Sequence, residues 1–176
     1  PFGFKELEGI HSRTDFDLSA HEKFSGRKLQ YFDPERNENY VPYVVETSIG
    51  LDRMFLALFS NCLKDEVLED GSERTVLSLP PALAPVKAAI LPLVKKDGLP
   101  EFAEKIFNDL KYDFNVISEE KDSIGKRYRR QDAIGTPFCI TVDHDSLADN
   151  TVTLRERDTM KQERVKVEDL RRIIDE

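Results

Sequence analysis

The feature that most constrains this chain is a proline-rich stretch near its middle. Residues 79–85 read Leu-Pro-Pro-Ala-Leu-Ala-Pro. Proline has no backbone N–H to donate and its ring clashes with the preceding helical turn, so this stretch cannot lie inside an ordinary helix. We therefore expect residues 79–85 to be a stiff linker between a first domain, residues 1–78, and a second, residues 86–176. The chain opens at Pro1 without an initiator methionine, so we expect it to be a piece of a longer protein.

Composition narrows the function classes. The chain has 176 residues, of which 39% are apolar and 34% charged, and its formal net charge is -8. Such an acidic balance argues against a protein that coats nucleic acid non-specifically, but it permits a local basic patch. Cys62 and Cys139 lie in apolar runs, and we expect them to be small buried residues rather than a disulfide or a metal pair. No apolar run is long enough to span a membrane, and we expect a cytoplasmic protein.

The second domain shows an alternating pattern of strands and helices. Strands are expected at residues 86–91, 114–117, 137–142, 151–155 and 163–167, and helices at residues 99–112, 123–132 and 168–175. Strands separated by helices predict an α/β fold, a sheet with helices packed on its faces. The last two strands read as a hairpin, so the sheet is expected to be mixed.

The first domain gives fewer signals. Residues 1–40 have no clean period, and the acidic residues 64–75 are expected to form a solvated surface turn. A β-rich run at 41–47 is followed by apolar residues at helical spacing up to Cys62, so we expect a strand that leads directly into an amphipathic helix. Ser48 is the expected N-cap of this helix.

The segment Glu46-Thr47-Ser48-Ile49-Gly50-Leu51-Asp52-Arg53, at the junction of that strand and helix, combines groups that could bind a small ligand. A helix N-terminus offers unpaired N–H groups to an anion, and Gly50 allows close approach to the backbone. Arg53 adds a planar cation for a phosphate, and Glu46 could hold an ammonium group. A capped helix with an exposed arginine and glutamate accounts for the same residues without a ligand.

A second candidate site is the run Lys126-Arg127-Tyr128-Arg129-Arg130, which has no acid among its members. Arginine forks onto phosphate, and tyrosine or arginine can stack on the unpaired bases that sequence-specific RNA recognition targets. Weaker candidates for the same surface are Arg155, Arg157 and Thr159. A solvated helix face explains the run equally well. We find no nucleophile, triad or metal-ligand spacing, so no catalytic or metal-binding residue is assigned.

Several segments, in order, resemble the glycyl-tRNA synthetases of the single-chain, dimeric type. The string "YVPYVVETSIGLDRMFLAL" resembles motif 3 of the class II synthetases, and "FKELEGIHSRTDFDLSAHEKFSG" resembles the family's preceding segment. The strings "LAPVKAAILPL", "DSIGKRYRRQDAIGTPFCITVD" and "DNTVTLRERDTMKQERV" resemble its anticodon-binding domain. The likeness covers nearly the whole chain, which is more specific than any single motif. It implies that residues 1–78 are the tail of an antiparallel-sheet catalytic domain, and that a mixed-sheet anticodon-binding domain follows.

Carried over by position, the resemblance implies a role for each candidate residue. The ATP site would contain Glu6, Leu7, Gly50, Leu51, Asp52 and Arg53. The glycine site would contain Glu46, Thr47, Ser48, Ile49 and Gly50. The tRNA-binding surface would contain Lys126, Arg127, Tyr128, Arg129, Arg130, Arg155 and Arg157. One departure is Thr47, where proline is expected in many relatives.

The resemblance also implies the reaction. The full enzyme would activate glycine with ATP, with Mg²⁺ assisting, transfer it to tRNA(Gly), and act as a homodimer. Class II motifs 1 and 2 are not recognised in this chain, so the piece alone is expected to be inactive. The alternative is a non-catalytic synthetase-like module that binds RNA or protein. Retention of Glu6, Glu46, Ser48 and Arg53 favours the enzyme, and a generic α/β domain leaves the ordered matches unexplained.

Overall fold

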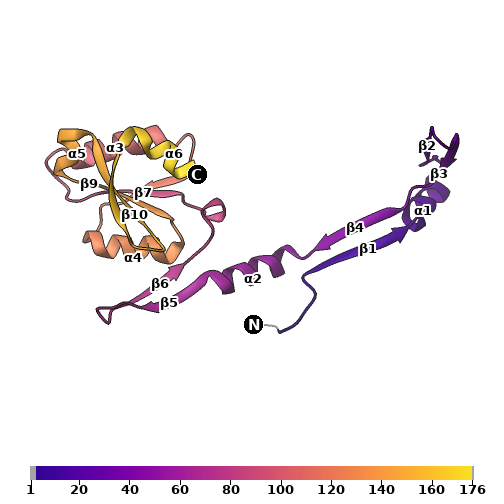
Figure 1. Cartoon of the computed structure of the whole chain (residues 1–176), viewed down its shortest axis with the longest axis horizontal. Helices are drawn as coiled ribbons and strands as arrows, with labels where there is room; N and C mark the ends of the chain where they lie inside the picture. Colours follow the sequence, from indigo (N-terminus) through magenta and orange to yellow (C-terminus); the bar gives the residue numbers. More distant parts are fainter. Residues whose placement is uncertain (1–2, 176) are drawn as a thin grey trace. The chain divides into compact units, whose positions relative to one another are not determined.

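The computed structural model describes residues 3–175, which divide into two compact units. Unit 1 is Pro1–Ala57 and unit 2 is Leu58–Glu176. The elements of each are labelled in Figure 1. The division differs from the boundary expected at residues 79–85, and the helix α2 (Leu51–Cys62) runs through it.

Unit 1 is built from two separate two-stranded pairings. Its elements are β1 (Glu8–Thr14), α1 (Phe16–Ser25), β2 (Tyr31–Asp33), β3 (Glu38–Tyr40) and β4 (Val44–Ile49). Strands β1 and β4 pair antiparallel, as do β2 and β3. In the β2–β3 hairpin the Tyr31 and Tyr40 rings meet edge to face, with their centroids 5.9 Å apart.

The expected strand-to-helix junction is present, but its cap is not Ser48. Strand β4 extends to Ile49, because pairing of Ser48 with Gly9 of β1 keeps Ser48 in extended backbone. The Gly50 carbonyl accepts the Met54 N–H at 2.8 Å and so begins the helix. The prediction of Ser48 as N-cap is therefore wrong by two residues.

The surface turn expected at 64–75 is also wrong, because most of these residues form a hairpin in unit 2. Strand β5 (Leu63–Val67) pairs antiparallel with β6 (Glu73–Leu77). Arg74 and Val76 of β6 are buried, so burial alternates along this charged segment as it does along a strand. The proline-rich stretch that follows contains a short 3₁₀ helix, η1 (Pro81–Leu83).

The rest of unit 2 is a five-stranded sheet in the order β11-β10-β9-β7-β8. Its strands are β7 (Ala88–Pro92), β8 (Val116–Ser118), β9 (Phe138–Val142), β10 (Thr151–Glu156) and β11 (Gln162–Lys166). Strand β7 is parallel to β8 and β9, whereas β10 is antiparallel to β9 and β11. The expected mixed sheet is confirmed.

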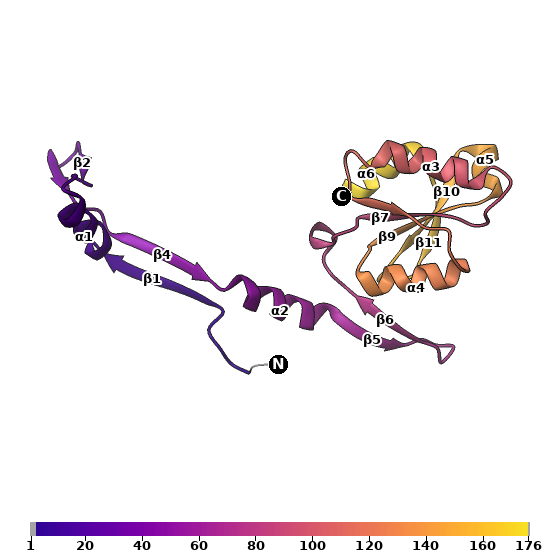
Figure 2. The same cartoon turned by 180° about the vertical axis from the view of Figure 1, so that it is seen from behind.

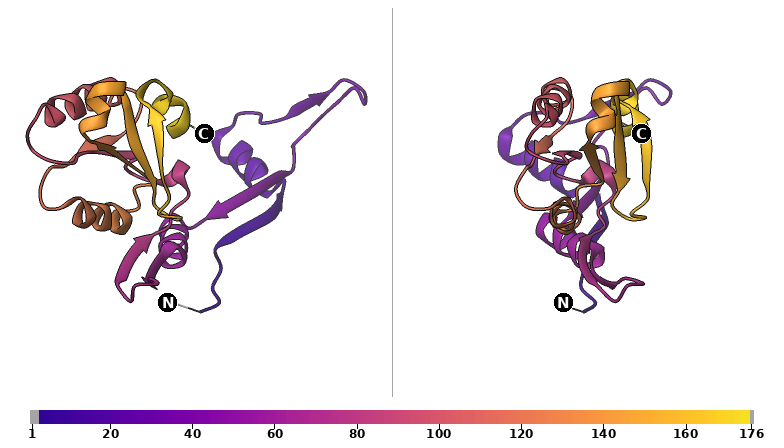
Figure 3. Two further views of the ribbon diagram at one scale, coloured as in Figure 1. Left: turned by 60° about the vertical axis from the view of Figure 1, so that its left-hand side comes forward. Right: turned by 90° about the vertical axis from the view of Figure 1, so that its left-hand side faces the viewer.

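Helices cover both faces of this sheet. They are α3 (Leu99–Leu110), α4 (Ile124–Ile134), α5 (His144–Asp149) and α6 (Leu170–Asp175), with a 3₁₀ turn η2 (Val167–Asp169) before the last. Figures 1 and 2 show α3, α5 and α6 on one face and α4 on the other, and Figure 3 gives further views of these layers. The six-residue α5, begun by an Asp143 capping box, was not predicted.

The two faces have separate apolar cores because side chains alternate along β7. Ala88 and Ile90 pack with α3 and α6, whereas Ala89 and Leu91 pack with Cys139 and α4. Both cysteines are buried, as expected, and burial raises the pKa of the Cys139 thiol to about 12. Within residues 3–175, no helix is long and apolar enough to cross a membrane.

Candidate substrate pocket and RNA-binding surface

The first candidate site is the corner between β4 and α2. The Gly50 N–H donates to the Leu7 carbonyl at 3.3 Å. Arg53 lies in the first turn of α2, and its Nη1 donates to the Glu6 carbonyl at 2.6 Å. The fold therefore brings Glu6 and Leu7 next to the Gly50–Arg53 segment, which is more than forty residues later in the chain.

Strand register divides the predicted glycine-site residues between two faces. Side chains alternate along a strand, so Glu46 and Ser48 share one face of β4, and Thr47 and Ile49 share the other. Gly9 of β1 lies opposite Ser48. Gly9 therefore leaves room beside Ser48, on the face that carries the Glu46 carboxylate, and the His11 imidazole occupies it.

That space depends on glycine. A Cβ atom added at Gly9 would lie 2.3 Å from His11 Nε2, closer than any non-bonded contact allows. His11 is the cross-strand partner of Glu46, so the crowding side chain belongs to the same strand pairing. A side chain at Gly9 would thus displace His11 as well as fill the space.

Arg13 is a further member of this face that sequence reasoning did not single out. Its guanidinium donates twice to Asp17, with both distances 2.8 Å, and its Nε lies 3.6 Å from Glu46 Oε2. The hydrogen bond from Arg13 lowers the pKa of Asp17. Arg13 lies in the string Arg-Thr-Asp-Phe-Asp-Leu that carried the family resemblance, so a signal existed, but its contact with Glu46 depends on β-register.

Residues of unit 1 leave this corner open. Leu51 is 80% exposed and Ile49 47% exposed, and among residues 3–57 Gly9 alone is buried. The described residues of unit 1 therefore form an open corner between a strand pair and a helix N-terminus.

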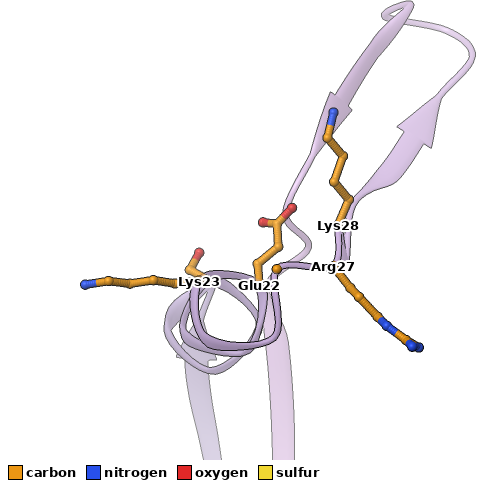
Figure 4. A pocket seen from close by; sticks show the side chains of 6 residues that line it. Glu22, Lys23, Arg27 and Lys28 are labelled. Carbon is orange, nitrogen blue, oxygen red and sulfur yellow. The ribbon is translucent and has the colours of Figure 1, made fainter.

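A separate hollow of about 370 Å³ lies at the end of α1. Its lining includes Glu22, Lys23, Arg27 and Lys28. Figure 4 shows the three basic side chains extending in different directions. They do not converge on a single point, so we assign no ligand to this hollow.

The second candidate site is α4, where Arg127 is buried instead of facing solvent. Only 2% of Arg127 is exposed. Its Nη1 donates to the carbonyls of Pro92 and Glu119 at 2.7 and 3.0 Å, and its Nη2 donates to the Leu93 carbonyl at 3.3 Å. Burial lowers the pKa of this guanidinium. The prediction of an open cationic surface is therefore wrong at Arg127, which joins the end of β7 to the segment that follows β8.

Arg155 and Arg157 are buried too, and an open surface is likewise wrong for them. Arg155 is 4% exposed and donates to both oxygens of Asp132, at 2.7 and 3.0 Å. Arg157 is 2% exposed and donates to the carbonyls of Gly135 and Leu79. These two arginines bind parts of the protein to each other.

The remaining predicted residues of the run reach the surface to different degrees. Lys126 is exposed. Arg130 is partly exposed and contacts Glu119 and Asp122. Arg129 is partly buried, and its Nη2 donates to Ser72 Oγ at 3.3 Å.

Tyr128 is held from two sides. Its hydroxyl lies 2.6 Å from Thr141 Oγ1, and the Arg155 guanidinium lies 4.8 Å from its ring centroid. Burial raises the pKa of the Tyr128 phenol. Thr159, the weaker candidate, is exposed and donates to Glu156 Oε2.

Comparison with known proteins decides the family. Residues 87–176, slightly more than half of the chain, match the model of the anticodon binding domain family. The chain belongs to this family. An RNA-binding domain of threonyl-tRNA synthetase from Cryptosporidium parvum has a similar fold, with a TM-score of 0.65 at 21% identity, covering 84% of this chain and 34% of that one.

Relatives with high identity extend beyond the anticodon-binding domain. The glycine–tRNA ligase of Chlorobaculum tepidum is 58% identical over 94% of this chain, that of Borrelia hermsii 54% over 97%, and that of Clostridium perfringens 55% over 99%. The chain spans 35%, 39% and 38% of these three relatives, respectively. The resemblance to glycyl-tRNA synthetases is confirmed over both units.

Proposed function

We propose that this chain is part of a glycine–tRNA ligase, in which unit 2 binds the anticodon of tRNA(Gly) and the Glu46–Arg53 corner forms part of the glycine and ATP pocket. The observation that carries the proposal is the identity to glycine–tRNA ligases, which extends over 94–99% of the chain. The part of the chain that aligns with these ligases includes both the Glu46–Arg53 corner and α4, so the two candidate sites would serve one enzyme.

The glycine site is proposed on the face shared by Glu46 and Ser48. Glycine has no side chain to recognise, so selection must come from holding its ammonium group and from excluding larger residues. The Glu46 carboxylate and the Ser48 hydroxyl would hold the ammonium, with Thr47, Ile49 and Gly50 shaping the cleft. Arg13, 3.6 Å from Glu46 Oε2, would orient that carboxylate.

The ATP site is proposed at the first turn of α2. Arg53 would contact a phosphate, and the helix N-terminus would favour the same charge. Glu6, Leu7, Leu51 and Asp52 would border the nucleotide. The 2.6 Å hydrogen bond from Arg53 to the Glu6 carbonyl supports this grouping, because it holds the guanidinium beside Glu6 and Leu7. Catalysis would come from positioning and charge stabilisation, without a protein nucleophile.

The Mg²⁺ expected with ATP has no ligand set of its own here. Residues 3–175 contain no group of three or more His, Cys, Asp or Glu side chains able to hold a metal ion. Magnesium commonly binds nucleotide enzymes through substrate phosphates and one or two carboxylates. We therefore assign no step to the metal in this part of the protein.

The tRNA-binding surface is proposed on α4. Lys126, Arg129 and Arg130 would meet the RNA. The Tyr128 ring packs against the sheet core and is proposed to support the helix from its inner side. Arg127, Arg155 and Arg157 are proposed to act indirectly, because they are buried and their Nη groups donate to internal acceptors. A local cationic surface suits an acidic chain that binds one RNA feature.

The finer features of the whole protein are proposals of the same kind. We propose a homodimer, as the family resemblance implies, and a cytoplasmic location, where unpaired thiols such as Cys62 and Cys139 are usual. The second candidate function is a non-catalytic RNA- or protein-binding module. It requires that the Glu46–Arg53 corner no longer takes part in glycine activation.

The test is glycine-dependent pyrophosphate exchange by the full-length gene product. Arg53→Ala should lower the exchange rate by about 10²–10³-fold, the usual cost of losing a group that stabilises transition-state charge. The matched control is Arg36→Ala, an exposed cation of the same unit, which should retain the activity. Wild-type protein without any glycine-dependent exchange would support the non-catalytic module, and a fully active Arg53→Ala variant would refute the role of Arg53.

A further inference from the structure

The β5–β6 hairpin lies against α4, the helix proposed to meet the RNA. Two hydrogen bonds join them (Figure 2 shows the two elements near each other). Arg74 Nη1 donates to Asp132 Oδ2 at 3.2 Å, and Arg129 Nη2 donates to Ser72 Oγ at 3.3 Å. Asp132 and Arg129 are three residues apart, so they lie on one side of α4. The hairpin thus contacts the helix at two successive turns.

Arg74 is the central residue of this contact. It is 4% exposed, although it lies in a strand of a two-stranded hairpin. Besides Asp132 it donates to Glu66 Oε2 at 2.7 Å, and to the carbonyls of Arg157 and Asp158 at 2.8 and 3.4 Å. A single buried guanidinium therefore joins the hairpin, α4 and the segment after β10.

Asp132 connects Arg74 to Tyr128 of α4. It is fully buried and also accepts the two-pronged hydrogen bond from Arg155. The Arg155 guanidinium in turn lies over the Tyr128 ring. Arg74 and Tyr128 are thus held by the same carboxylate, one directly and one through Arg155.

The turn of the hairpin orients Arg129. The Ser72 hydroxyl donates to Asp70 Oδ1 at 2.6 Å, so its lone pairs are left to accept from Arg129. A long arginine side chain on a helix surface otherwise samples many rotamers, and fixing one of them lowers the entropy lost on binding. The hairpin therefore limits the conformations of a cation that the proposed function assigns to RNA contact.

We propose that Arg74 is a positioning residue for RNA binding, and that the β5–β6 hairpin is a working part of the RNA-binding unit. Through Asp132, Arg74 fixes the helix that presents Arg129, while Ser72 fixes the Arg129 side chain. This inference rests on the proposed function of α4. It adds a role for a segment that lies outside residues 87–176, the part matched by the family model.

The test compares tRNA(Gly) affinity of the 176-residue chain and its Arg74→Met variant, measured by fluorescence anisotropy of labelled tRNA at several salt concentrations. The methionine variant removes the guanidinium, but Asp132 keeps its pair with Arg155, so the core charge stays balanced. Folding is checked by far-UV circular dichroism at the assay temperature. Arg171→Met, an exposed arginine of α6 paired with Asp109 and Asp113, is the matched control.

Arg74→Met should weaken binding by about tenfold, because Arg129 is no longer held in place. The slope of log affinity against log salt concentration should fall by about one, which corresponds to one fewer released ion. Arg74→Lys keeps the charge without the planar fork and should restore the affinity in part. Arg171→Met should bind like wild type. A purely structural Arg74 would lower the unfolding temperature but leave the affinity and salt slope of the folded protein unchanged, which would overturn the proposal.

If Arg74→Met is unfolded at the assay temperature, Ser72→Ala decides instead. It removes the acceptor for Arg129 at a solvent-facing turn and should weaken binding by about two- to threefold. Unchanged binding by the folded Ser72→Ala protein would then overturn the proposal. Failure of the proposed function is recognised separately, since in that case the wild-type chain itself does not bind tRNA(Gly).

Discussion

Unit 1 and unit 2 contain similar kinds of residue, but only unit 2 buries its large apolar side chains in a core. In unit 2, residues from four of the five strands of the sheet and from α3 and α6 form a continuous buried core. In unit 1, large apolar side chains such as Ile10, Phe24 and Leu51 are mostly exposed. The difference shows that apolar periodicity determines which face of a helix or strand is apolar. Burial of that face requires a second layer of secondary structure packed against it.

The comparison extends to charged residues. Unit 2 buries several arginines almost fully and provides them with carboxylates or carbonyls, as Arg74, Arg127 and Arg155 illustrate. The ion pairs of unit 1, such as Arg13 with Asp17, remain accessible to solvent. Exposed pairs contribute little to stability, so the two units should respond very differently to substitution.

The largest expected difference is in independent folding. Residues 58–176 expressed alone should unfold in one cooperative urea transition followed by far-UV circular dichroism, whereas residues 1–57 alone should show none, because they lack a core. Residues 82–176 should also fold, as expected from the proline-rich stretch, but with a free energy of unfolding lower by about 3 kcal/mol because the Arg74 contacts are lost. A cooperative transition for residues 1–57 would contradict the comparison.

A smaller difference is expected for single cations. Arg127→Ala should lower the free energy of unfolding by about 3 kcal/mol, because three carbonyls lose a buried donor. Arg36→Ala in unit 1, and the exposed neighbour Lys126→Ala in unit 2, should each change it by less than about 0.5 kcal/mol. Urea titrations of the full chain measure all three. Equal effects of Arg127→Ala and Lys126→Ala would show that burial of Arg127 has no energetic consequence.

The smallest expected difference concerns acid. Hydrogen bonds from Arg157 lower the pKa of Asp158 in the folded protein. At Asp143, burial acts to raise the pKa but is outweighed by the hydrogen bonds from Arg164 and Ser146, so its pKa is lowered as well. A lowered folded-state pKa stabilises the fold above the unfolded value of about 3.9 and loses that effect as pH falls below it.

The thermal unfolding midpoint of residues 58–176 should therefore decrease as the pH is lowered below about 4. Asp158→Asn should make this decrease shallower. Asp17 of unit 1 also has a lowered pKa, but its partner Arg13 is solvent-accessible whereas the Arg157 partner of Asp158 is buried, so Asp17→Asn in the full chain should leave the profile unchanged. An Asp158→Asn profile identical to wild type would contradict the assignment.

Sequence reasoning predicted unit 2 far better than unit 1. The helix expected at 99–112 was found because Leu99, Ala103, Ile106 and Leu110 repeat on one face, and all four are buried. The β5–β6 hairpin was missed because its alternation consists of charged residues, of which Arg74 is buried only through partners distant in the chain. In residues 1–40, pairing of β1 with β4 defines the strand, and no local pattern shows it.

The candidate sites divide in the same way. Local chemistry singled out the Glu46–Arg53 segment and the family resemblance implied its role together with Glu6 and Leu7, whereas Gly9 and Arg13 enter only through cross-strand register. In the basic run, the inward face of the helix includes a charged residue, so its helical spacing was not recognised. Ile124, Arg127, Tyr128 and Gln131 have the i, i+3, i+4, i+7 spacing of an inward face, which could have indicated that Arg127 points toward the sheet.

The measurement that most directly tests the central claim is equilibrium binding of the 176-residue chain to tRNA(Gly), compared with the same tRNA carrying a substituted anticodon. Proteins that read unpaired loop bases discriminate against base changes there. The account predicts that the chain binds tRNA(Gly) and that the anticodon substitution weakens binding by about tenfold or more. Equal affinity for the two RNAs, or no binding of either, would contradict it.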